Sequence, residues 1–188
     1  VSLQNNNITI NSTVTTTTGN GTVTLNAASG TLTLAAAADI SSGGIVELTG
    51  STAISTAGDV TTTGDAVYYN SAVTLTGAVA VNTTSGSAAG AAIDFDSTIN
   101  GTFNLTLTAG TGGNITFDQA VGGTTPLAVI SIASAQNVTA SFGISATGLG
   151  QTTGSGLTTL NGAVTTTGAA GVSLQNNNIT INSTVTTT

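Results

Sequence analysis

A short pattern of apolar residues recurs along the whole chain, at intervals of about 21 residues. Each copy spans seven residues: an apolar or Thr residue opens it, turn-forming residues follow, and Val or Ile closes it. Because apolar and polar residues alternate within the copies, the pattern predicts strands with one buried face. The eight closing residues are therefore the predicted core positions: Val14, Ile40, Val60, Val79, Ile99, Val121, Ile144 and Val164.

A much longer repeat encloses the short one. Residues 1–17 and 172–188 are identical, at an offset of 171 positions. A match over the whole of this segment indicates tandem copies of a long repeat, or a designed overlap. We expect residues 1–171 to form one complete copy and residues 172–188 to begin the next. The coil at Ile179 should then stack as the coil at Ile8 does.

The two periods together predict an all-β fold, a parallel right-handed β-helix or β-solenoid. It should have about 21 residues per coil and about eight coils per 171-residue repeat. A single coil cannot bury its own apolar face, so stacking of the coils must create the core. A string of β-sandwich domains is the alternative, but sandwich strands recur roughly every 8–12 residues without a uniform motif of the length found here.

The charge balance excludes several classes of function. The chain contains no Lys, Arg, His or Cys, and seven acidic residues give it a net charge of −7. Without cations, neither nucleic-acid binding through phosphates nor docking to an acidic membrane is expected. Nucleophilic triads and zinc sites built on His or Cys lack their residues. No apolar run approaches the length that a membrane-spanning helix needs, so we expect no membrane insertion in this segment.

Acidic residues supply the candidate metal site. Asp94 and Asp96 are two positions apart on a predicted strand, and Asp118 follows one coil later. Stacked carboxylates of this kind can bind Ca²⁺, which takes six to eight oxygen ligands. The alternative is that Asp residues cap corners of the coils by bonding to nearby backbone, as we expect for Asp39 and Asp59. No cofactor other than calcium is expected.

Catalysis is not expected from these carboxylates. Paired carboxylates hydrolyse glycosidic bonds in many enzymes, and some parallel β-helix proteins cleave polysaccharides. Here no Arg, Lys or His is present to support them. The chain is therefore predicted not to be an enzyme.

Exposed Thr and Tyr residues are candidates for a binding surface. Thr-x-Thr pairs such as Thr15 with Thr17 are frequent, and a flat ladder of such pairs is how β-helical ice-binding proteins contact ice. Thr is also an ordinary outward-facing strand residue. Tyr68 and Tyr69 point to opposite faces of a strand, so one should be in the core and one exposed, where it can stack on a sugar. The other pairs are Thr22 with Thr24, Thr61 with Thr63, Thr74 with Thr76, and Thr165 with Thr167.

Asn residues precede x-Ser or x-Thr at many positions. In a Thr-rich chain such sequons arise by composition, and Asn is expected to stack between coils or to form corners. Glycosylation at these sites is the alternative. The positions are Asn7, Asn11, Asn20, Asn82, Asn100, Asn104, Asn114, Asn137, Asn178 and Asn182.

The Gly-punctuated runs resemble the repetitive stalks of bacterial surface proteins. Residues 7–11 (Asn-Ile-Thr-Ile-Asn), 30–34 (Gly-Thr-Leu-Thr-Leu) and 73–77 (Val-Thr-Leu-Thr-Gly) are similar to runs in filamentous-haemagglutinin-like and autotransporter-type β-helical adhesins. The resemblance covers the whole chain but is one of composition. It implies a secreted, right-handed β-helix displayed at the cell surface.

The expected function is structural. Tandem copies stacked end to end would build a long rod, so we expect a segment of an extracellular fibre or adhesin stalk. Its partners would be further copies of the same repeat, with lateral contacts to neighbouring filaments or to surface glycans. The alternative is a binding module whose exposed Thr, Asn and Tyr ladders contact carbohydrate, ice or a neighbouring filament.

Overall fold

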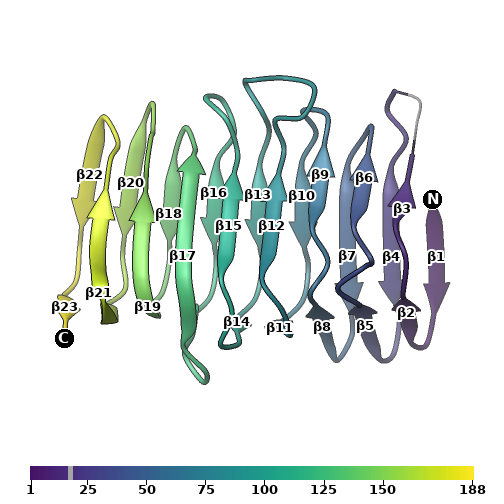
Figure 1. Cartoon of the computed structure of the whole chain (residues 1–188), viewed down its shortest axis with the longest axis horizontal. Helices are drawn as coiled ribbons and strands as arrows, with labels where there is room; N and C mark the ends of the chain where they lie inside the picture. The colour runs from purple at the N-terminus through teal and green to yellow at the C-terminus, as the bar shows by residue number, and fades with distance from the viewer. Residues whose placement is uncertain (17–18) are drawn as a thin grey trace.

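The chain winds into a column of stacked coils, each made of short strands joined by bends and turns (Figure 1). The computed structural model describes residues 1–16 and 19–188. Thr17, one member of a predicted Thr pair, lies outside the described residues. All strand pairs in the described ranges are parallel, and they join residues about 22 positions apart. The predicted all-β parallel solenoid is therefore confirmed.

Within the described residues, the first face of the solenoid is a nine-stranded parallel sheet, and each coil contributes one strand to it. Figure 1 shows these strands side by side along the long axis of the molecule. In spatial order they are β1 (Ser2–Asn5), β4 (Val23–Ala27), β7 (Val46–Gly50), β10 (Val67–Tyr69), β13 (Ile93–Phe95), β16 (Ile115–Phe117), β18 (Val138–Ala140), β20 (Leu157–Leu160) and β22 (Asn178–Ile181).

The second face is narrower and begins as a five-stranded sheet. Isolated bridges from Ile99 to Val121 and from Val121 to Ile144 continue it. Beyond these bridges, the second face continues through the first residues of two longer strands, whose later residues belong to the third face. A short strand that follows them is the last strand of the second face. Its strands are β2 (Ile8–Ile10), β5 (Thr31–Leu34), β8 (Ala53–Thr56), β11 (Val73–Leu75), β14 (Ile99–Asn100), the starts of β19 (Ile144–Gln151) and β21 (Val164–Leu174), and β23 (Val185–Thr187).

The third face completes each coil. It includes the later residues of β19 and β21, which carry the chain around a corner while still pairing with each other. Its other strands are β3 (Val14–Thr15), β6 (Ile40–Ser42), β9 (Val60–Thr62), β12 (Val79–Asn82), β15 (Leu105–Thr108) and β17 (Leu127–Ser134).

Apolar side chains from all three faces fill the interior of the coils. The inward residues of one coil lie directly over those of the next, as in the column that runs from Val23 through Val46 and Val67 to Ile93. The bulkiest part of the core is an aromatic stack of Tyr69, Phe95 and Phe117 on the first face. Their ring centroids are 4.6 and 5.6 Å apart. Stacking therefore buries side chains that no single coil could enclose.

Seven of the eight predicted closing residues are buried, but they do not form one column. Val14, Ile40 and Val60 stack on the third face, where Val81 rather than Val79 continues the column. Val79 lies beside that column and pairs with Leu105. Val14, in the first coil, is only half-buried because no coil covers its outer side.

The other four closing residues belong to the second face. Ile99, Val121, Ile144 and Val164 extend the column of Val73, which is an opening residue of the seven-residue pattern. The expected common alignment of the eight copies is therefore wrong. In the first half of the chain, the seven-residue pattern spans the corner between the second and third faces. In the second half, it spans the corner between the first and second faces. Both placements bury the apolar positions, so the pattern itself does not distinguish them.

The coils are also slightly longer than predicted. Leu3 and Ile181 lie in one column of the first face and are separated by eight steps of parallel pairing. Successive coils are therefore about 22 residues apart. The 171-residue offset corresponds to about seven and two-thirds coils rather than eight. The expected equivalence of Ile8 and Ile179 is wrong: Ile8 lies on the second face and Ile179 on the first.

Both ends of the solenoid present unpaired strand edges and partly exposed apolar side chains. Val1 and Leu3 are 48% and 42% exposed at one end. At the other end Ile179 and Ile181 are 42% and 48% exposed. Natural solenoids normally cover such ends with polar capping repeats, because bare strand edges pair with other chains.

Candidate functional site

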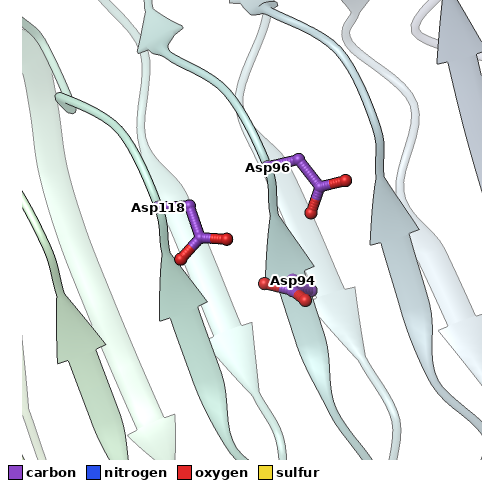
Figure 2. Close-up of side chains that lie close together, drawn as sticks. All are labelled: Asp94, Asp96 and Asp118. Carbon is purple, nitrogen blue, oxygen red and sulfur yellow. The ribbon is translucent and has the colours of Figure 1, made fainter.

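The structure brings the three predicted calcium ligands together on the first face. Asp94 lies within β13, Asp96 directly follows that strand, and Asp118 directly follows β16 on the next coil. One carboxylate oxygen from each residue lies within 4.8 Å of the others. Figure 2 shows the three side chains on the same side of these two neighbouring coils. We call this group the Asp triad.

The three carboxylates differ in their surroundings. Asp96 and Asp118 are exposed, whereas Asp94 is half-buried and its Oδ1 atom has no hydrogen-bond partner among the described residues. Partial burial, and then the negative charges of Asp96 and Asp118, raise the pKa of Asp94 above its usual value of 3.8. No cationic side chain exists in the chain to relieve this repulsion. The Asp triad is thus a region of concentrated, uncompensated negative charge.

A divalent cation is the kind of ligand that fits this arrangement. Hard cations such as Ca²⁺ prefer carboxylate oxygens, and three carboxylates offer up to six of them. A bound cation would also remove the repulsion that raises the pKa of Asp94. The open position of Asp96 and Asp118 leaves room for water to complete the coordination.

Calcium binding can be measured directly at this group. We expect injection of calcium chloride into the wild-type chain to produce a saturable heat and to raise the melting temperature. Asp96→Asn should lose most of both effects, because it removes one charged ligand. Glu47→Gln, on the same outward column two coils away from Asp94, is the matched control and should leave both effects unchanged. Absence of heat and of any thermal shift in the wild type would refute calcium binding.

The same group predicts a distinctive pH dependence. A raised pKa means that the folded chain keeps the proton on Asp94 at pH values where the unfolded chain has released it. The contribution of Asp94 to the free energy of unfolding is therefore greatest below the usual pKa of 3.8, and it falls as the pH rises through the raised pKa. Asp94→Asn should raise the melting temperature at neutral pH and flatten this fall, and Glu47→Gln should do neither. A less stable Asp94→Asn chain with an unchanged pH profile would contradict the assignment.

Two other acidic residues cap corners, as the alternative interpretation predicted. Asp39 Oδ1 accepts a hydrogen bond of 2.9 Å from the backbone N–H of Asp59 on the next coil. Asp59 Oδ1 in turn accepts one of 2.7 Å from the backbone N–H of Ala80. These carboxylates satisfy backbone donors of the next coil, so their role is to join neighbouring coils.

The predicted Thr pairs do not form a ladder on one face. Thr24 lies on the first face, Thr74 on the second, and Thr61 on the third. A different set of Thr residues is in register, and sequence reasoning missed it because the set is defined only by pairing between coils. This Thr column stands on the outer side of the first face and continues directly from Asp94: Thr116, Thr139, Thr159 and Thr180.

Asn residues stack between coils at several positions, as predicted for part of the sequon set. Asn137 Nδ2 donates to Asn114 Oδ1 at 2.9 Å, and Asn182 Nδ2 donates to Asn161 Oδ1 at 2.8 Å. Asn137 Oδ1 also accepts the backbone N–H of Leu157 on the following coil. These amides join successive corners, and they remain partly accessible at the surface.

The two Tyr residues are on opposite sides of β10, as their sequence positions predicted. Tyr69 is buried in the aromatic stack, and its hydroxyl has no hydrogen-bond partner among the described residues. Burial, with a smaller effect of Asp59, raises the pKa of this phenol above its usual value. Tyr68 is half-exposed on the outer column of the first face, between Glu47 and Asp94. It is therefore the ring that a ligand can reach.

A buried polar group near the end of the chain had no counterpart in the sequence predictions. Thr158 takes a core position that is Val or Ile in the coils before it, and Gln151 is buried beside it. The Thr158 hydroxyl donates to Gln151 Oε1 at 2.6 Å and accepts from Asn176 Nδ2 at 2.9 Å. The group links the last complete coil to the segment that repeats the N-terminal sequence.

The described part of the chain contains no helix that is both long enough and apolar enough to cross a membrane. Comparison with protein-family models, with curated proteins and with solved structures finds no match to this chain.

Proposed function

We propose that this chain is a structural segment of a long extracellular fibre or adhesin stalk. One observation carries the proposal: the start of the second repeat, residues 172–188, continues the backbone pairing of the coils before it. The solenoid does not close at the repeat boundary. Tandem copies would therefore extend one rod rather than form separate domains on a string.

The composition of the chain suits exposure outside a cell. It has no Cys or Met, which are the main targets of oxidation, and no Lys or Arg, after which trypsin-like proteases cut. The resemblance to filamentous-haemagglutinin-like and autotransporter-type adhesins supports the same location. In the described part of the chain, the backbone pairing between coils leaves strand edges of the first face at the two ends of the column only.

Antibodies raised against the 188-residue chain test this role in the source cells. We expect immunogold particles on intact cells, at distances from the envelope that increase with the number of repeats in the full-length protein. Labelling that appears only after the cells are opened would overturn the proposal.

Side-by-side association of the rods should depend on charge. Because all seven charged side chains are negative, rods repel one another at neutral pH. We expect acidification, or millimolar calcium, to increase the turbidity of a solution of rods, with sodium chloride of equal ionic strength as the control. Turbidity that responds to neither acid nor calcium would count against lateral association through these groups.

A surface binding module is the second candidate, favoured by the continuous Thr column and the accessible Tyr68. This outer surface joins a carboxylate group, hydroxyls in register and an aromatic ring on one face. Sugars are recognised by groups of this kind, with the ring stacking on the apolar side of the sugar. Binding on a glycan array that is lost in Tyr68→Ala would support a carbohydrate role. Inhibition of ice growth would instead identify ice as the partner, and bundling would identify a neighbouring filament.

A further inference from the structure

Residues 1–16 and their identical copy, residues 172–187, occupy different faces of the solenoid. Val1–Leu3 leads into the first face, whereas its copy, Val172–Leu174, lies on the third. Residues 8–10 pair on the second face, and their copy, residues 179–181, pairs on the first. The last part of the segment moves from the third face, where Val14 pairs with Ile40, to the column of the second face, where Val185 follows Val164. Each part of the second copy thus lies one face away from its counterpart in the first copy, always in the same direction around the coil.

The corner at Asn5 and Asn6 is built in the same way in both copies, although its neighbours differ. Asn5 Oδ1 accepts a hydrogen bond from the backbone N–H of Asn6 at 2.8 Å, and Asn176 Oδ1 accepts one from Asn177 at the same distance. The two later strands of the segment, β2 and β3, begin and end within one residue of their counterparts β22 and β23, whereas the first strand ends at Asn5 in one copy and at Leu174, the counterpart of Leu3, in the other. The segment is therefore a corner with adjoining strands that is used at two different sides of the coil.

The side chains of this corner find partners on either face. In the first copy, Asn7 Oδ1 accepts the backbone N–H of Thr31 from the following coil. In the second copy, Asn176 bonds to the backbone N–H of Gly156 and to the hydroxyl of Thr158 on the preceding coil. These are different positions of the corner, because Asn176 is the counterpart of Asn5, so each face is contacted through a different Asn amide, a group that both donates and accepts.

The apolar residues of the segment also fit both faces. Ile8 and Ile10 stack on Leu32 and Leu34 in the first copy. Their counterparts, Ile179 and Ile181, stack on Thr158 and Leu160. Since the apolar residues alternate in the same way on every face, a displacement by one face keeps them inside the coil.

We propose that successive copies of the repeat dock on one another with a rotation of one third of a turn about the rod axis. The partner of the open edge at the C-terminal end is thus another copy of this chain, placed one face out of phase. The cause is the length of the repeat, which corresponds to about seven and two-thirds coils of about 22 residues. This inference rests on the proposed stacking of tandem copies and specifies its register.

The rotation distributes every surface feature of the repeat around the rod. The Asp triad of one copy and that of the next would lie on different faces, and only every third copy would present it on the same side. The rod would then offer the same groups to neighbours in three directions. A rod of eight whole coils per copy would instead present them along a single edge.

Pairs of engineered Cys residues can determine the register, because the natural chain contains none. In the rotated arrangement Thr159 is the neighbour of Thr180, and Thr165 is the neighbour of Thr186. Without rotation, Thr180 would take the place of its counterpart Thr9 on the second face, beside Thr165. Neighbouring outward residues on parallel strands are close enough for a disulfide.

We expect oxidation of the 188-residue chain to form a disulfide in T159C/T180C and in T165C/T186C, but not in T165C/T180C. The pair T139C/T159C, neighbours in the body of the solenoid, is the positive control. Mass spectrometry counts the remaining free thiols, and circular dichroism checks that each variant keeps its β structure. A disulfide in T165C/T180C without one in T159C/T180C overturns the rotation, as does the absence of both while the control pair forms.

A chain of several tandem copies tests the consequence for the rod. Glu47→Cys in every copy, labelled with gold particles, should place every third particle along the same side of the rod. Particles along a single edge would overturn the rotation while leaving the rod, and hence the fibre proposal, intact. Cell labelling and rod formation can fail without changing the disulfide result, so the two proposals are separable.

Discussion

Replacement of Phe95 by Ala is expected to lower the free energy of unfolding by about 3–5 kcal/mol, the usual cost of removing a large ring from a packed core. Phe95 is 1% exposed and is the middle ring of the aromatic stack, between Tyr69 and Phe117. Its removal would leave a cavity that the backbone pairing of the adjacent coils prevents from collapsing. Denaturant unfolding of the 188-residue chain, followed by circular dichroism, measures the effect.

Tyr69→Phe is the matched control in the same stack. It keeps the ring and removes a buried hydroxyl that lacks a partner among the described residues. Removing an unsatisfied buried group gains stability rather than losing it, by about 1 kcal/mol. A Phe95→Ala chain within about 1 kcal/mol of the wild type would show that the stack is not part of the core.

Gly122→Val is the second change with a large expected effect, a loss of about 3 kcal/mol. Gly122 follows the isolated bridge residue Val121 and has a φ of +71°, in the left-handed region that side chains disfavour. An added Cβ atom would also collide with the backbone carbonyl oxygen of Ser145 on the next coil. The loss would be visible as a lower midpoint of denaturant unfolding.

Gly150→Ala provides the comparison for Gly122. Gly150 lies in β19, and a Cβ atom at this position would meet nothing within 4 Å. We expect its substitution to change the stability by less than about 0.5 kcal/mol, as at most surface positions. Equal effects of the two substitutions would contradict the close approach of coils at Gly122.

The solenoid could be predicted from the sequence because its cause is local. Alternation of apolar and polar residues requires a strand with one buried face, and the regular recurrence of that pattern requires coils that bury the face by stacking. The Asp triad could be predicted for the same reason. Asp94 and Asp96 share a strand side at a spacing of two, and Asp118 occupies the same place one coil later.

The register between coils could not be predicted, since it depends on the lengths of the corners. Apolar residues alternate in the same way on all three faces, so Val79 and Ile99 look equivalent in sequence although they lie on different faces. The Thr column was missed because Thr116, Thr139 and Thr159 are aligned only after each corner length is known. The displacement of residues 172–188 by one face has the same origin.

Electron microscopy of chains with increasing numbers of tandem copies tests the continuous solenoid most directly. With about 22 residues per coil and roughly 4.8 Å between coils, each added 171-residue copy should lengthen an unbranched rod of constant width by about 37 Å. Globular particles, or beads joined by flexible linkers, would contradict the continuous solenoid.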